Sequence, residues 1–509
     1  MRVAERLLAL PGVRRATLVM ASPANREILA EAGLLDAAAA RAQPSDLLIV
    51  IDAQTSELAQ AALVQAEQSL TGNIAVGAEA PRGEPAPRSL GMALSRTDGA
   101  RLAQISVPGP YAAAEALKAI KAGLHVFLFS DNVPIAQERA IKQAAQAKRL
   151  LVMGPDCGTA IIGGVPLGFA NVVRRGPIGL VAASGTGLQE VTCQIHLHGG
   201  GISHAIGTGG RDVTDEIGGL TMLAGIDALR DDPATKVIVV VSKPPGASVA
   251  AHVLAKLRST GKPAVVLFIG SDSGLDSDSE TRSSGNIHVA RSLLEAATTA
   301  VHLAGGAKPA LPRGDDNAIA APPGSAQGYV RALYSGGTYC SETQAIWRDF
   351  DLHAWSNVPL DKRYKLADAR CSVAHTVVDL GEDEFTVGRP HPMIDLSSRI
   401  ERMQVEAADP ETALLMLDVV LGYGSHVDPA GGLAASIGKA RAIARAAGRE
   451  LPVVTFVCGT ELDPQRLETQ RATLIAAGAM VAPSSSQAAR WAGQFIAAGR
   501  RASPAEPQR

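Results

Sequence analysis

Two turns rich in glycine, serine and threonine have the residue types and spacing to bind an anion. The first begins at Ser184, where a predicted buried strand, "GPIGLVAA", runs into "SGTG" and a helical pattern follows. A helix that begins there directs free N–H groups and the positive end of its dipole at the turn, which favours an anion. The alternative is a tight strand-to-helix connection in which Ser184 only caps the helix.

The second turn emerges from an internal repeat. "GLVAASGTGLQEVTCQI" corresponds to "RALYSGGTYCSETQAI", and "DDPATKVIVVVSKPPG" corresponds to "ADPETALLMLDVVLGYG", in the same order along the chain. The repeat predicts two related three-layer domains whose helix N-termini point at one centre and hold a phosphoryl group. Chance similarity between α/β segments is the alternative. The predicted phosphate-binding residues are Ser184, Gly185, Thr186, Gly187, Ser335, Gly336, Gly337 and Thr338.

Charged residues follow two of the predicted strands. Arg211 and Asp212, in "GTGGRD", come after a glycine-rich strand end. An arginine there could bind a carboxylate or phosphate through two hydrogen bonds, or it could pair with an aspartate and only fix the loop. Lys243, in "SKPPG", is either a substrate contact at a strand's carboxyl end or a solvated surface lysine.

The segment "GRPHPMID" adds three candidates, Arg389, His391 and Asp395. Two prolines fix the backbone around His391, which is either a proton-transfer or carbonyl-polarising group or a histidine satisfied inside a rigid loop. Arg389 occupies the position in the repeat that corresponds to Arg211. Asp395 is predicted to contact substrate.

The elements that must position these residues are those of an α/β fold. Short β-branched runs such as "LLIVID", "HVFLFS", "KVIVVVSKP" and "PVVTFVCGT" alternate with alanine-rich helical stretches. The pattern predicts parallel strands covered on both faces, with ligands at the carboxyl ends of the strands. Residues 304–327 are predicted to form an interdomain linker, and residues 501–509 a disordered tail.

Composition excludes several classes of partner. The 509 residues carry a net charge of −2 and only 3% are aromatic, which argues against a nucleic-acid or anionic-membrane surface. The five cysteines form no C-x-x-C pair, so neither a disulfide framework nor a metal site is predicted. No apolar run approaches the ~18 residues of a membrane span, and the N-terminus lacks a signal-peptide pattern. We therefore expect a cytoplasmic protein.

The two-helix arrangement resembles succinyl-CoA synthetase, whose α and β subunits each contribute such a helix to one phosphate site. "ISVPGPYAAAEALKAIKAGLHVFLFSDNVP" and "LVMGPDCGT" resemble the CoA-binding domain of its α subunit, and "GPIGLVAASGTGLQE" with "IGTGGRD" its ligase domain. More closely, the chain resembles the FdrA family through "SPANREIL", "DNVP", "HAIGTGGRD" and "GRPHPMID". The resemblance implies a Rossmann-like CoA-binding-type domain over residues 1–173. Two flavodoxin-like three-layer domains follow over residues 174–303 and 328–500, the second resembling the carboxyl-terminal domain of the β subunit.

The same resemblance implies that Asp156 and Cys157, in "GPDCGT", lie near substrate. Cys157 has no evident base partner that would make it a nucleophile. No G-x-G-x-x-G follows the first strand, so dinucleotide binding is disfavoured, and CoA is a cofactor by analogy only.

Two departures from succinyl-CoA synthetase bear on the reaction. The ATP-grasp domain has no counterpart, and the "GHAGA" loop that carries the phosphorylated histidine is missing. His288 is the only histidine in the corresponding segment of this sequence, and we expect it to have a surface or capping role and not to be phosphorylated.

The FdrA resemblance implies a subunit of an ATP-independent carbamoyltransferase, similar to oxamate carbamoyltransferase in allantoin breakdown. Oxalurate and phosphate there give oxamate and carbamoyl phosphate. The alternative is a subunit of an ADP-forming acyl-CoA synthetase whose ATP-grasp domain is supplied in trans. A third reading is a non-catalytic subunit that binds an anionic metabolite. The expected partners are companion subunits in an oligomer and a small anionic substrate, which is carbamoyl phosphate, oxamate or an acyl-CoA.

Overall fold

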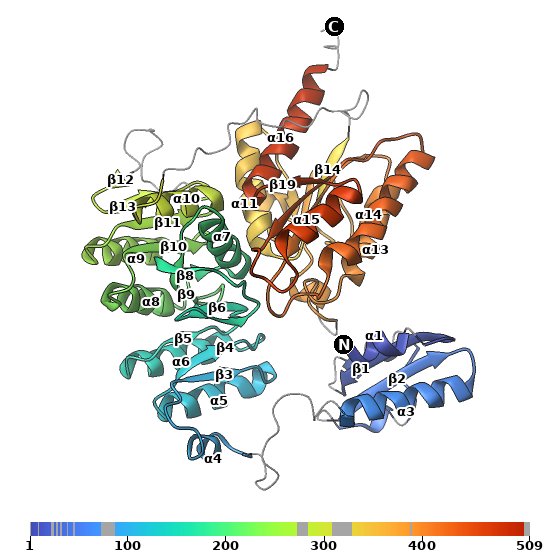
Figure 1. Cartoon of the computed structure of the whole chain (residues 1–509), viewed down its shortest axis with the longest axis horizontal. Helices are drawn as coiled ribbons and strands as arrows, with labels where there is room; N and C mark the ends of the chain where they lie inside the picture. The colour runs from blue at the N-terminus through green and yellow to red at the C-terminus, as the bar shows by residue number, and fades with distance from the viewer. Residues whose placement is uncertain are drawn as a thin grey trace. The chain divides into compact units, whose positions relative to one another are not determined.

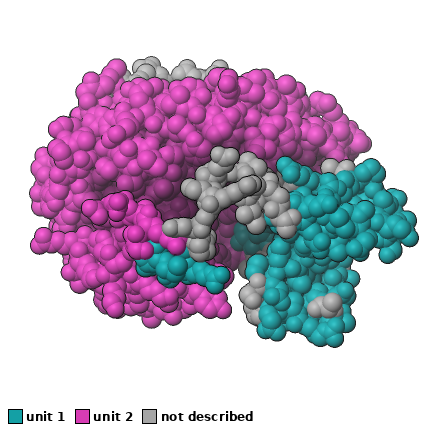
Figure 2. Space-filling view, turned by 60° about the horizontal axis from the view of Figure 1, so that its bottom comes forward, with its two compact units in different colours: residues 1–93, 386–390 teal, residues 94–385, 391–509 magenta. Residues whose placement is uncertain are grey.

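The computed structural model divides the chain into two compact units (Figure 1). The first comprises residues 1–93 and 386–390, and the second residues 94–385 and 391–509 (Figure 2). Most of the predicted linker and tail lies outside the described residues. The structure describes residues 2–502 apart from residues 9, 22–24, 27–28, 31–32, 38, 44–45, 73–86, 272–282, 308–327 and 387–388.

The first unit is a small sheet packed against helices. Strands β1 (Val13–Met20) and β2 (Leu47–Ala53) pair antiparallel, with Val13 opposite Ala53 and Met20 opposite Leu47. The apolar run "LLIVID", predicted to be a parallel strand covered on both faces, is therefore antiparallel, and its residues are only half-buried. The described helices of this unit are α1 (Arg2–Leu8), the short 3-10 helix η1 (Ala39–Arg41), α3 (Ser56–Gly72) and α4 (Leu90–Leu94), which ends at the unit boundary.

The second unit begins with a small parallel sheet of the Rossmann-like type. Its strands run in the order β3, β4, β5, and all are parallel. The bounds are β3 (Leu102–Ile105), α5 (Gly109–Lys121), β4 (His125–Leu128), α6 (Ile135–Ala147) and β5 (Val152–Met153).

An eight-stranded sheet follows, in the order β12-β13-β11-β10-β8-β9-β6-β7. The run from β9 to β13 is parallel and has the flavodoxin-like order 2-1-3-4-5 when β8 is counted as the first strand. The sheets do not change at residue 173, because β6 already pairs antiparallel with β9. The strands are β6 (Thr159–Ile162), β7 (Val165–Gly168), β8 (Arg175–Ala183), β9 (Ile202–Gly207), β10 (Val237–Ser242), β11 (Ala264–Phe268), β12 (Ser283–Ser284) and β13 (Ile287–Val289).

A six-stranded parallel sheet repeats this topology, in the order β15-β16-β14-β17-β18-β19. With β14 as its first strand, the order from β16 onward is again 2-1-3-4-5. The fold class expected from the repeat is confirmed. The strands are β14 (Tyr329–Tyr334), β15 (Trp355–Ser356), β16 (Thr376–Asp379), β17 (Thr412–Val420), β18 (Val453–Cys458) and β19 (Met480–Ala482).

One hydrophobic core lies between the two large sheets and is built from both domains. Leu188 and Val191 of α7 (Gly185–Leu197) share it with Tyr339 and Trp347 of α11 (Gly337–Trp347) and Phe495 of α16 (Ser485–Ala502). This shared core places α7 and α11 against each other. The helices of the eight-stranded domain are α7 (Gly185–Leu197), α8 (Leu220–Asp231), α9 (Ala247–Ser259) and α10 (Leu293–Leu303). Those of the six-stranded domain are α11 (Gly337–Trp347), α12 (Asp383–Thr386), α13 (Ser397–Ala408), α14 (Pro429–Ala446), α15 (Leu467–Ala476) and α16 (Ser485–Ala502). Among the described helices, none is both long enough and apolar enough to span a membrane.

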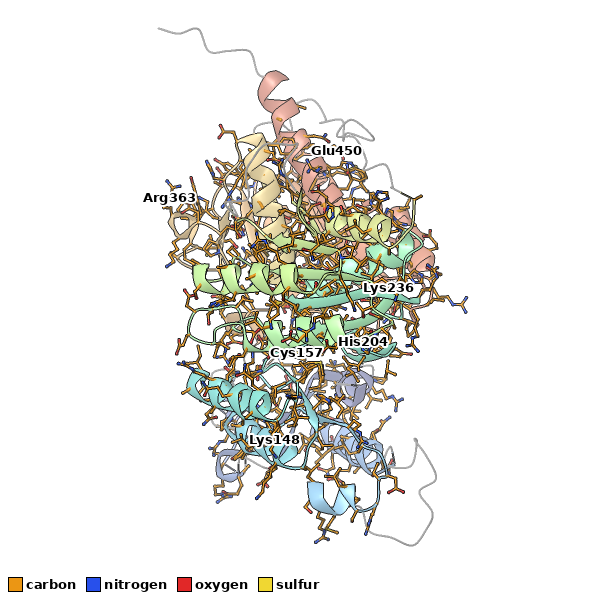
Figure 3. The ribbon with its side chains drawn as sticks, turned by 90° about the vertical axis from the view of Figure 1, so that its left-hand side faces the viewer. Lys148, Cys157, His204, Lys236, Arg363 and Glu450 are labelled. Atoms are coloured by element: carbon orange, nitrogen blue, oxygen red, sulfur yellow. The ribbon has the colours of Figure 1, made fainter. Side chains whose placement is uncertain are left out.

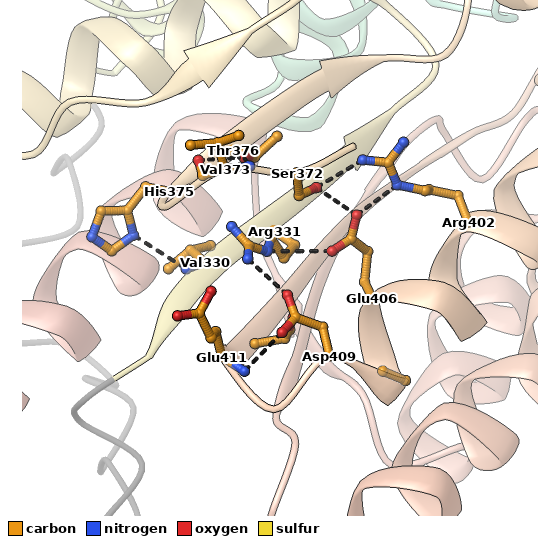
Figure 4. A network of polar contacts seen from close by, with 12 residues as sticks. Val330, Arg331, Ser372, Val373, His375, Thr376, Arg402, Glu406, Asp409 and Glu411 are labelled. Carbon is orange, nitrogen blue, oxygen red and sulfur yellow. Dashed lines mark hydrogen bonds and ion pairs between the residues drawn. The ribbon is translucent and has the colours of Figure 1, made fainter. Parts of the chain in front are cut away.

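A buried ionic network ties β14 to α13 at the end of the sheet away from the helix N-termini (Figure 4). Arg331 Nε lies 3.3 Å from Glu406, and Arg331 donates to Asp409 at 2.8 Å. Glu406 also accepts from Arg402 and from Ser372, each at 2.5 Å. The single carboxylate of Glu406 therefore offsets two buried guanidinium groups.

We expect Glu406→Gln to lower the free energy of unfolding by roughly 3 kcal/mol, because it leaves buried arginine charge without its partner. Urea denaturation measures this change. The matched control is Glu450→Gln (Glu450 is labelled in Figure 3), whose pair with Arg445 is 56% exposed on both sides. There we expect a change below about 0.5 kcal/mol. Equal losses in the two variants would contradict the assignment of a stabilising role to the buried network.

Candidate functional site

The N-termini of α7 and α11 meet at the centre of the second unit. Ser184 is the N-cap of α7, and its Oγ accepts a hydrogen bond from the N–H of Gly187 at 3.1 Å. The same Oγ lies 2.5 Å from Oγ1 of Thr338, in the first turn of α11. The first N–H groups of any helix have no partner within the helix, so two sets of donors converge here. The predicted pair of helix ends at one centre is present in the geometry.

Glycine is required at this junction because backbone and side chains approach so closely. A Cβ on Gly336 would lie 2.6 Å from Oγ1 of Thr186 and nearer still to its methyl group. A Cβ on Gly187 would lie 2.9 Å from the methyl group of Thr338. Gly336, and not Ser335, is the N-cap of α11. The glycines of the two turns therefore allow the helix ends to touch.

Strand register explains which side chains surround the two helix ends. Ser242 pairs with Ala183, so Lys243 follows β10 directly beside the start of α7. Tyr334 pairs with Asp379, which places this aspartate at the carboxyl end of β16, beside the start of α11. In flavodoxin-like sheets the carboxyl ends of the first and third strands flank the ligand crevice, and β8 and β10 hold those positions here.

Lys243 and Asp379 lie against the first residue of α11. A Cβ on Gly337 would lie 2.8 Å from Nζ of Lys243 and 2.8 Å from Oδ2 of Asp379. Asp379 is 4% exposed, and its Oδ1 accepts from the N–H of Gly381 at 2.8 Å. No hydrogen bond or ion pair reaches Oδ2 or the Lys243 ammonium from the described residues. One cation and one carboxyl oxygen are thus left for a ligand.

Burial, together with the charge of Glu382, raises the pKa of Asp379 to about 7, although Lys243 lowers it. The carboxyl group is consequently about half protonated at neutral pH. Two unit negative charges 4 Å apart repel by about 4 kcal/mol at the effective dielectric constant of a protein site. An anion beside ionised Asp379 would meet a penalty of this order.

Ser335 has a different role from the predicted one. Its N–H donates to Oδ1 of Asp418 at 3.0 Å, and its hydroxyl donates to the other oxygen of that carboxylate. Arg399 pairs with Asp418 at 2.8 Å and donates to its carbonyl oxygen at 2.6 Å. The Ser335 hydroxyl is therefore engaged by the chain's own carboxylate.

His391 directs its Nε2 toward the same end of the site. Its Nδ1 accepts from the N–H of Met393 at 3.3 Å, so Nε2 carries the hydrogen of the neutral ring. Nε2 lies 2.7 Å and Asp379 Oδ1 3.0 Å from the position of a Cβ on Gly381. Burial lowers the pKa of His391 to about 4, although Asp418 raises it. The ring is neutral at pH 7 and is available as a hydrogen-bond donor.

Arg211 and Asp212 lie in a separate ionic cluster, in which Asp212 is buried and the Arg211 side chain is 41% exposed. Arg211 pairs with Glu138 at 2.9 Å and donates to the carbonyl oxygen of Val133 at 2.7 Å. Asp212 pairs with Lys142 at 2.7 Å and accepts from two N–H groups at the start of α8. These contacts join α6 to the loop before α8. They agree with the alternative in which Arg211 pairs with a carboxylate and only fixes its loop, except that the partner is Glu138 and not an aspartate.

Asp156 is an exposed residue that lies near several other carboxyl groups. Desolvation by the surrounding protein, together with the charges of Asp131, Asp383 and Glu382, raises its pKa to about 6 despite the opposing charge of Arg211. The cluster of acids gives this part of the surface a negative field.

The neighbouring Cys157, labelled in Figure 3, is buried and packs with the core between the three-stranded and eight-stranded sheets. Its Sγ lies 3.4 Å from the carbonyl oxygen of Thr159, and burial raises its pKa to about 12. A thiol with so high a pKa holds almost no thiolate at neutral pH, in line with the expectation that it is no nucleophile.

The remaining candidates do not join the two helix ends. Asp395 accepts from the N–H and hydroxyl of Ser397 at 2.9 and 2.6 Å, at the start of α13. Arg389 belongs to the segment grouped with the first unit, whereas His391 belongs to the second. His288 lies on β13 opposite Val265, and burial lowers its pKa. The segment that would carry a phosphohistidine loop spans residues 268–293, of which residues 272–282 lie outside the described residues.

Sequence reasoning missed four carboxyl groups near the helix ends. Asp379 and Asp418 lie within apolar runs, "TVVDL" and "LLMLDVV", which were interpreted only as buried strands. An aspartate inside a fully buried strand was the available signal, since a charge there needs a dedicated partner. Glu190 and Glu342 occupy the same position in the repeat, and both are 1% exposed or less.

Comparison with known proteins finds a CoA-binding-type sequence on one side of the junction and a CoA-ligase-type sequence on the other. The profile of the family described as CoA binding domain matches residues 174–270, and that described as CoA-ligase matches residues 333–495. The first match falls where sequence analysis placed a ligase-type domain, and not within residues 1–173. A third, described as "AllF, heavy metal-associated domain", matches residues 1–85.

Among curated proteins, "Uncharacterized protein YahF" of Escherichia coli (strain K12) is 42% identical over 99% of this chain and 96% of its own length. The ADP-forming succinate–CoA ligase subunit alpha of Staphylococcus epidermidis is 27% identical over 38% of this chain and 64% of its own. The same subunit of Aquifex aeolicus is 31% identical over 28% of this chain and 48% of its own length. The chain thus spans roughly half to two thirds of these ligase subunits. An acetyl-coenzyme A synthetase 1 of Ca. Korarchaeum cryptofilum aligns with 79% of this chain at 15% identity and TM-score 0.32.

The description of the N-terminal match raises the question of a metal. Residues 1–85 contain no cysteine and no histidine, which are the ligands that soft metals prefer. Throughout the described parts of the chain, no three or more His, Cys, Asp or Glu side chains are grouped so as to hold a metal ion. The residues present do not fit a heavy-metal site.

We expect Gly336→Ala to separate the two helix ends and to cost about 1–3 kcal/mol of stability, because its methyl group collides with Thr186. Thermal and urea unfolding measure the loss. In the Thr186→Ala background the same substitution should cost clearly less, since the colliding group is gone. The control is Gly438→Ala within α14, where no atom lies within 4 Å and a gain of roughly 0.5–1 kcal/mol is expected. If Gly336→Ala lowers the free energy of unfolding equally with Thr186 present and with Thr186→Ala, close packing between these two residues is refuted.

Proposed function

Because the chain belongs to the same family as the Escherichia coli protein YahF, and joins a CoA-binding-type to a CoA-ligase-type domain, we propose that it is a ligase-type enzyme subunit. Its task is to hold a phosphate or acyl phosphate between α7 and α11. The observation that carries the proposal is the 2.5 Å contact between Ser184 and Thr338, which joins the two helix N-termini. α7 starts in the segment that matches the CoA binding domain family, and α11 starts in the segment that matches the CoA-ligase family.

The groups at the junction are suited to a phosphoryl group. The N–H groups of Gly185, which is exposed, and of Thr186, which is buried, lie at the start of α7. Lys243 supplies a positive charge that no hydrogen bond or ion pair from the described residues engages, although Asp379 lies nearby. Donors that are already oriented cost no reorganisation when charge develops on a transferring phosphoryl or acyl oxygen. In this proposal Lys243 neutralises the anion and the α7 N–H groups fix its oxygens.

The favoured reaction is that of an acyl-CoA synthetase. An acyl phosphate reacts with the CoA thiol, the acyl group moves to sulfur, and phosphate leaves with its oxygens held at the junction. CoA is the proposed cofactor. No ATP-grasp segment stands between the two ligase-type domains, so a companion polypeptide would supply ATP-dependent phosphorylation.

Carbamoyl transfer is the second candidate, through the proposed membership of the FdrA family. The observation that favours it is the combination of a two-helix phosphate site with no "GHAGA" histidine loop and no ATP-grasp segment in the sequence. Phosphate would then attack the carbamoyl carbon of oxalurate, and oxamate would leave as carbamoyl phosphate forms. This reaction needs no ATP.

The two candidates are separated with the complex co-purified from its native host on a tag attached to this chain. One reaction contains ATP, CoA and succinate, and the other contains carbamoyl phosphate and oxamate. ATP-dependent thioester formation supports the synthetase. Oxamate-dependent release of phosphate without ATP supports the transferase. Product formation in neither reaction, together with no binding of phosphate, would remove both.

We expect Lys243→Ala to weaken binding of inorganic phosphate by ten- to a hundredfold, the loss of one charge-assisted hydrogen bond. Isothermal titration with the full chain measures the dissociation constant. The control is Lys236→Ala, an exposed lysine just before the opposite end of the same strand, β10, which Figure 3 labels. It should leave the affinity unchanged. If both variants bind as the unaltered chain does, phosphate does not sit beside Lys243.

A further inference from the structure

The unpartnered oxygen of Asp379 faces the place where the proposed function puts an anion. Its Oδ2 and the Nζ of Lys243 lie at equal distances, 2.8 Å, from the same point beside the first residue of α11. A carboxyl oxygen at the N-terminus of a helix, next to an ammonium group, occupies the position that a phosphate oxygen would seek. A ligand dianion and an ionised Asp379 therefore compete for the same donors.

Asp379 cannot turn away from this position. Its N–H donates to Oδ1 of Asn357 at 2.9 Å, and its carbonyl oxygen accepts from Nδ2 of the same residue at 2.8 Å. Its Oδ1 is held by the N–H of Gly381 at 2.8 Å. With backbone and Oδ1 fixed, Oδ2 must face Gly337 in either protonation state.

We propose that Asp379 couples anion binding at this junction to proton uptake: its carboxyl group takes a proton from solvent when a dianion binds, and donates that hydrogen to an anion oxygen. The proposal rests on the proposed function, since it concerns the same site. It makes Asp379 a ligand of the anion that switches from repelling it to binding it. No other group need move.

Competing titrations are few and can be separated. His391 is neutral throughout the range from pH 6 to 8, because its pKa is lowered to about 4. Glu190 has a pKa raised to about 7 by burial and by Glu342, and Asp156 one raised to about 6, so both could add a pH dependence. The charged groups facing Asp379 itself are Lys243, Glu382 and Asp418.

The test uses sulfate, which stays a dianion between pH 6 and 8, so that only the protein titrates. For the full chain, the sulfate dissociation constant should rise about tenfold from pH 6 to pH 8, because above pH 7 each binding event must first protonate Asp379. Titration at pH 8 in two buffers of different ionisation heat should show uptake of close to one proton. This measurement needs no variant.

Asp379→Asn gives the sharper result. The amide keeps the acceptor for Gly381 and presents a permanent N–H donor where Oδ2 lies, so its sulfate affinity should be flat from pH 6 to 8. At pH 8 it should bind sulfate about tenfold more tightly than the unaltered chain, a gain that structural damage would not produce. Glu190→Gln, Asp156→Asn and the exposed Asp231→Asn should keep the original pH dependence.

The outcomes distinguish this proposal from the function on which it rests. Absence of both sulfate and phosphate binding at every pH overturns the proposed function. Binding with no proton uptake overturns the coupling and leaves the site standing. A pH dependence that survives in Asp379→Asn but vanishes in Glu190→Gln assigns the titration to the α7 glutamate and also overturns the role of Asp379.

Discussion

The N-termini of α7 and α11 carry partial positive charges. Packing of both helices in one shared core holds these ends so close that the hydroxyl groups of Ser184 and Thr338 are in contact. Two positive dipole ends that are buried side by side repel each other unless negative charge is near. The chain supplies some of that charge itself. Asp418 takes both donors of Ser335, and Asp379 lies against Gly337. The positive potential of the two helix ends is thus partly offset by these carboxyl groups, and a bound anion can offset the rest.

The two halves of the site are related by the repeat but are not equivalent. At α7 the first residue, Gly185, is exposed, and Ser184 caps its own helix. At α11 the first residue is buried and flanked by Lys243 and Asp379. An unsymmetrical phosphate, with an acyl group on one oxygen, would suit a site that is open on one side and closed on the other.

Glu190 and Glu342 are buried one turn further along α7 and α11, at the same interface between the two domains. Burial changes the protonation of these two acids as it does that of Asp379. Glu342 accepts from the hydroxyls of Ser485 and Ser486, at 2.5 and 2.9 Å. Burial raises the pKa of both glutamates, that of Glu190 to about 7, with Glu342 as its second cause. Protonation at this depth relieves like-charge repulsion between the domains, which accounts for two adjacent acids in one core.

Local patterns in the sequence determined a large part of this protein. Strand runs ending in Gly, Ser or Pro predicted the parallel sheets, and the repeat predicted two helix ends of the same kind, because such features depend on neighbours along the chain. Tertiary structure alone decided the rest. The "LLIVID" run became an antiparallel strand, and Arg211 found Glu138 on another helix. Asp379 acquired its raised pKa because strand pairing buried it beside Gly337. Burial and cross-strand partners are set by packing between distant segments, and no spacing of residues encodes them.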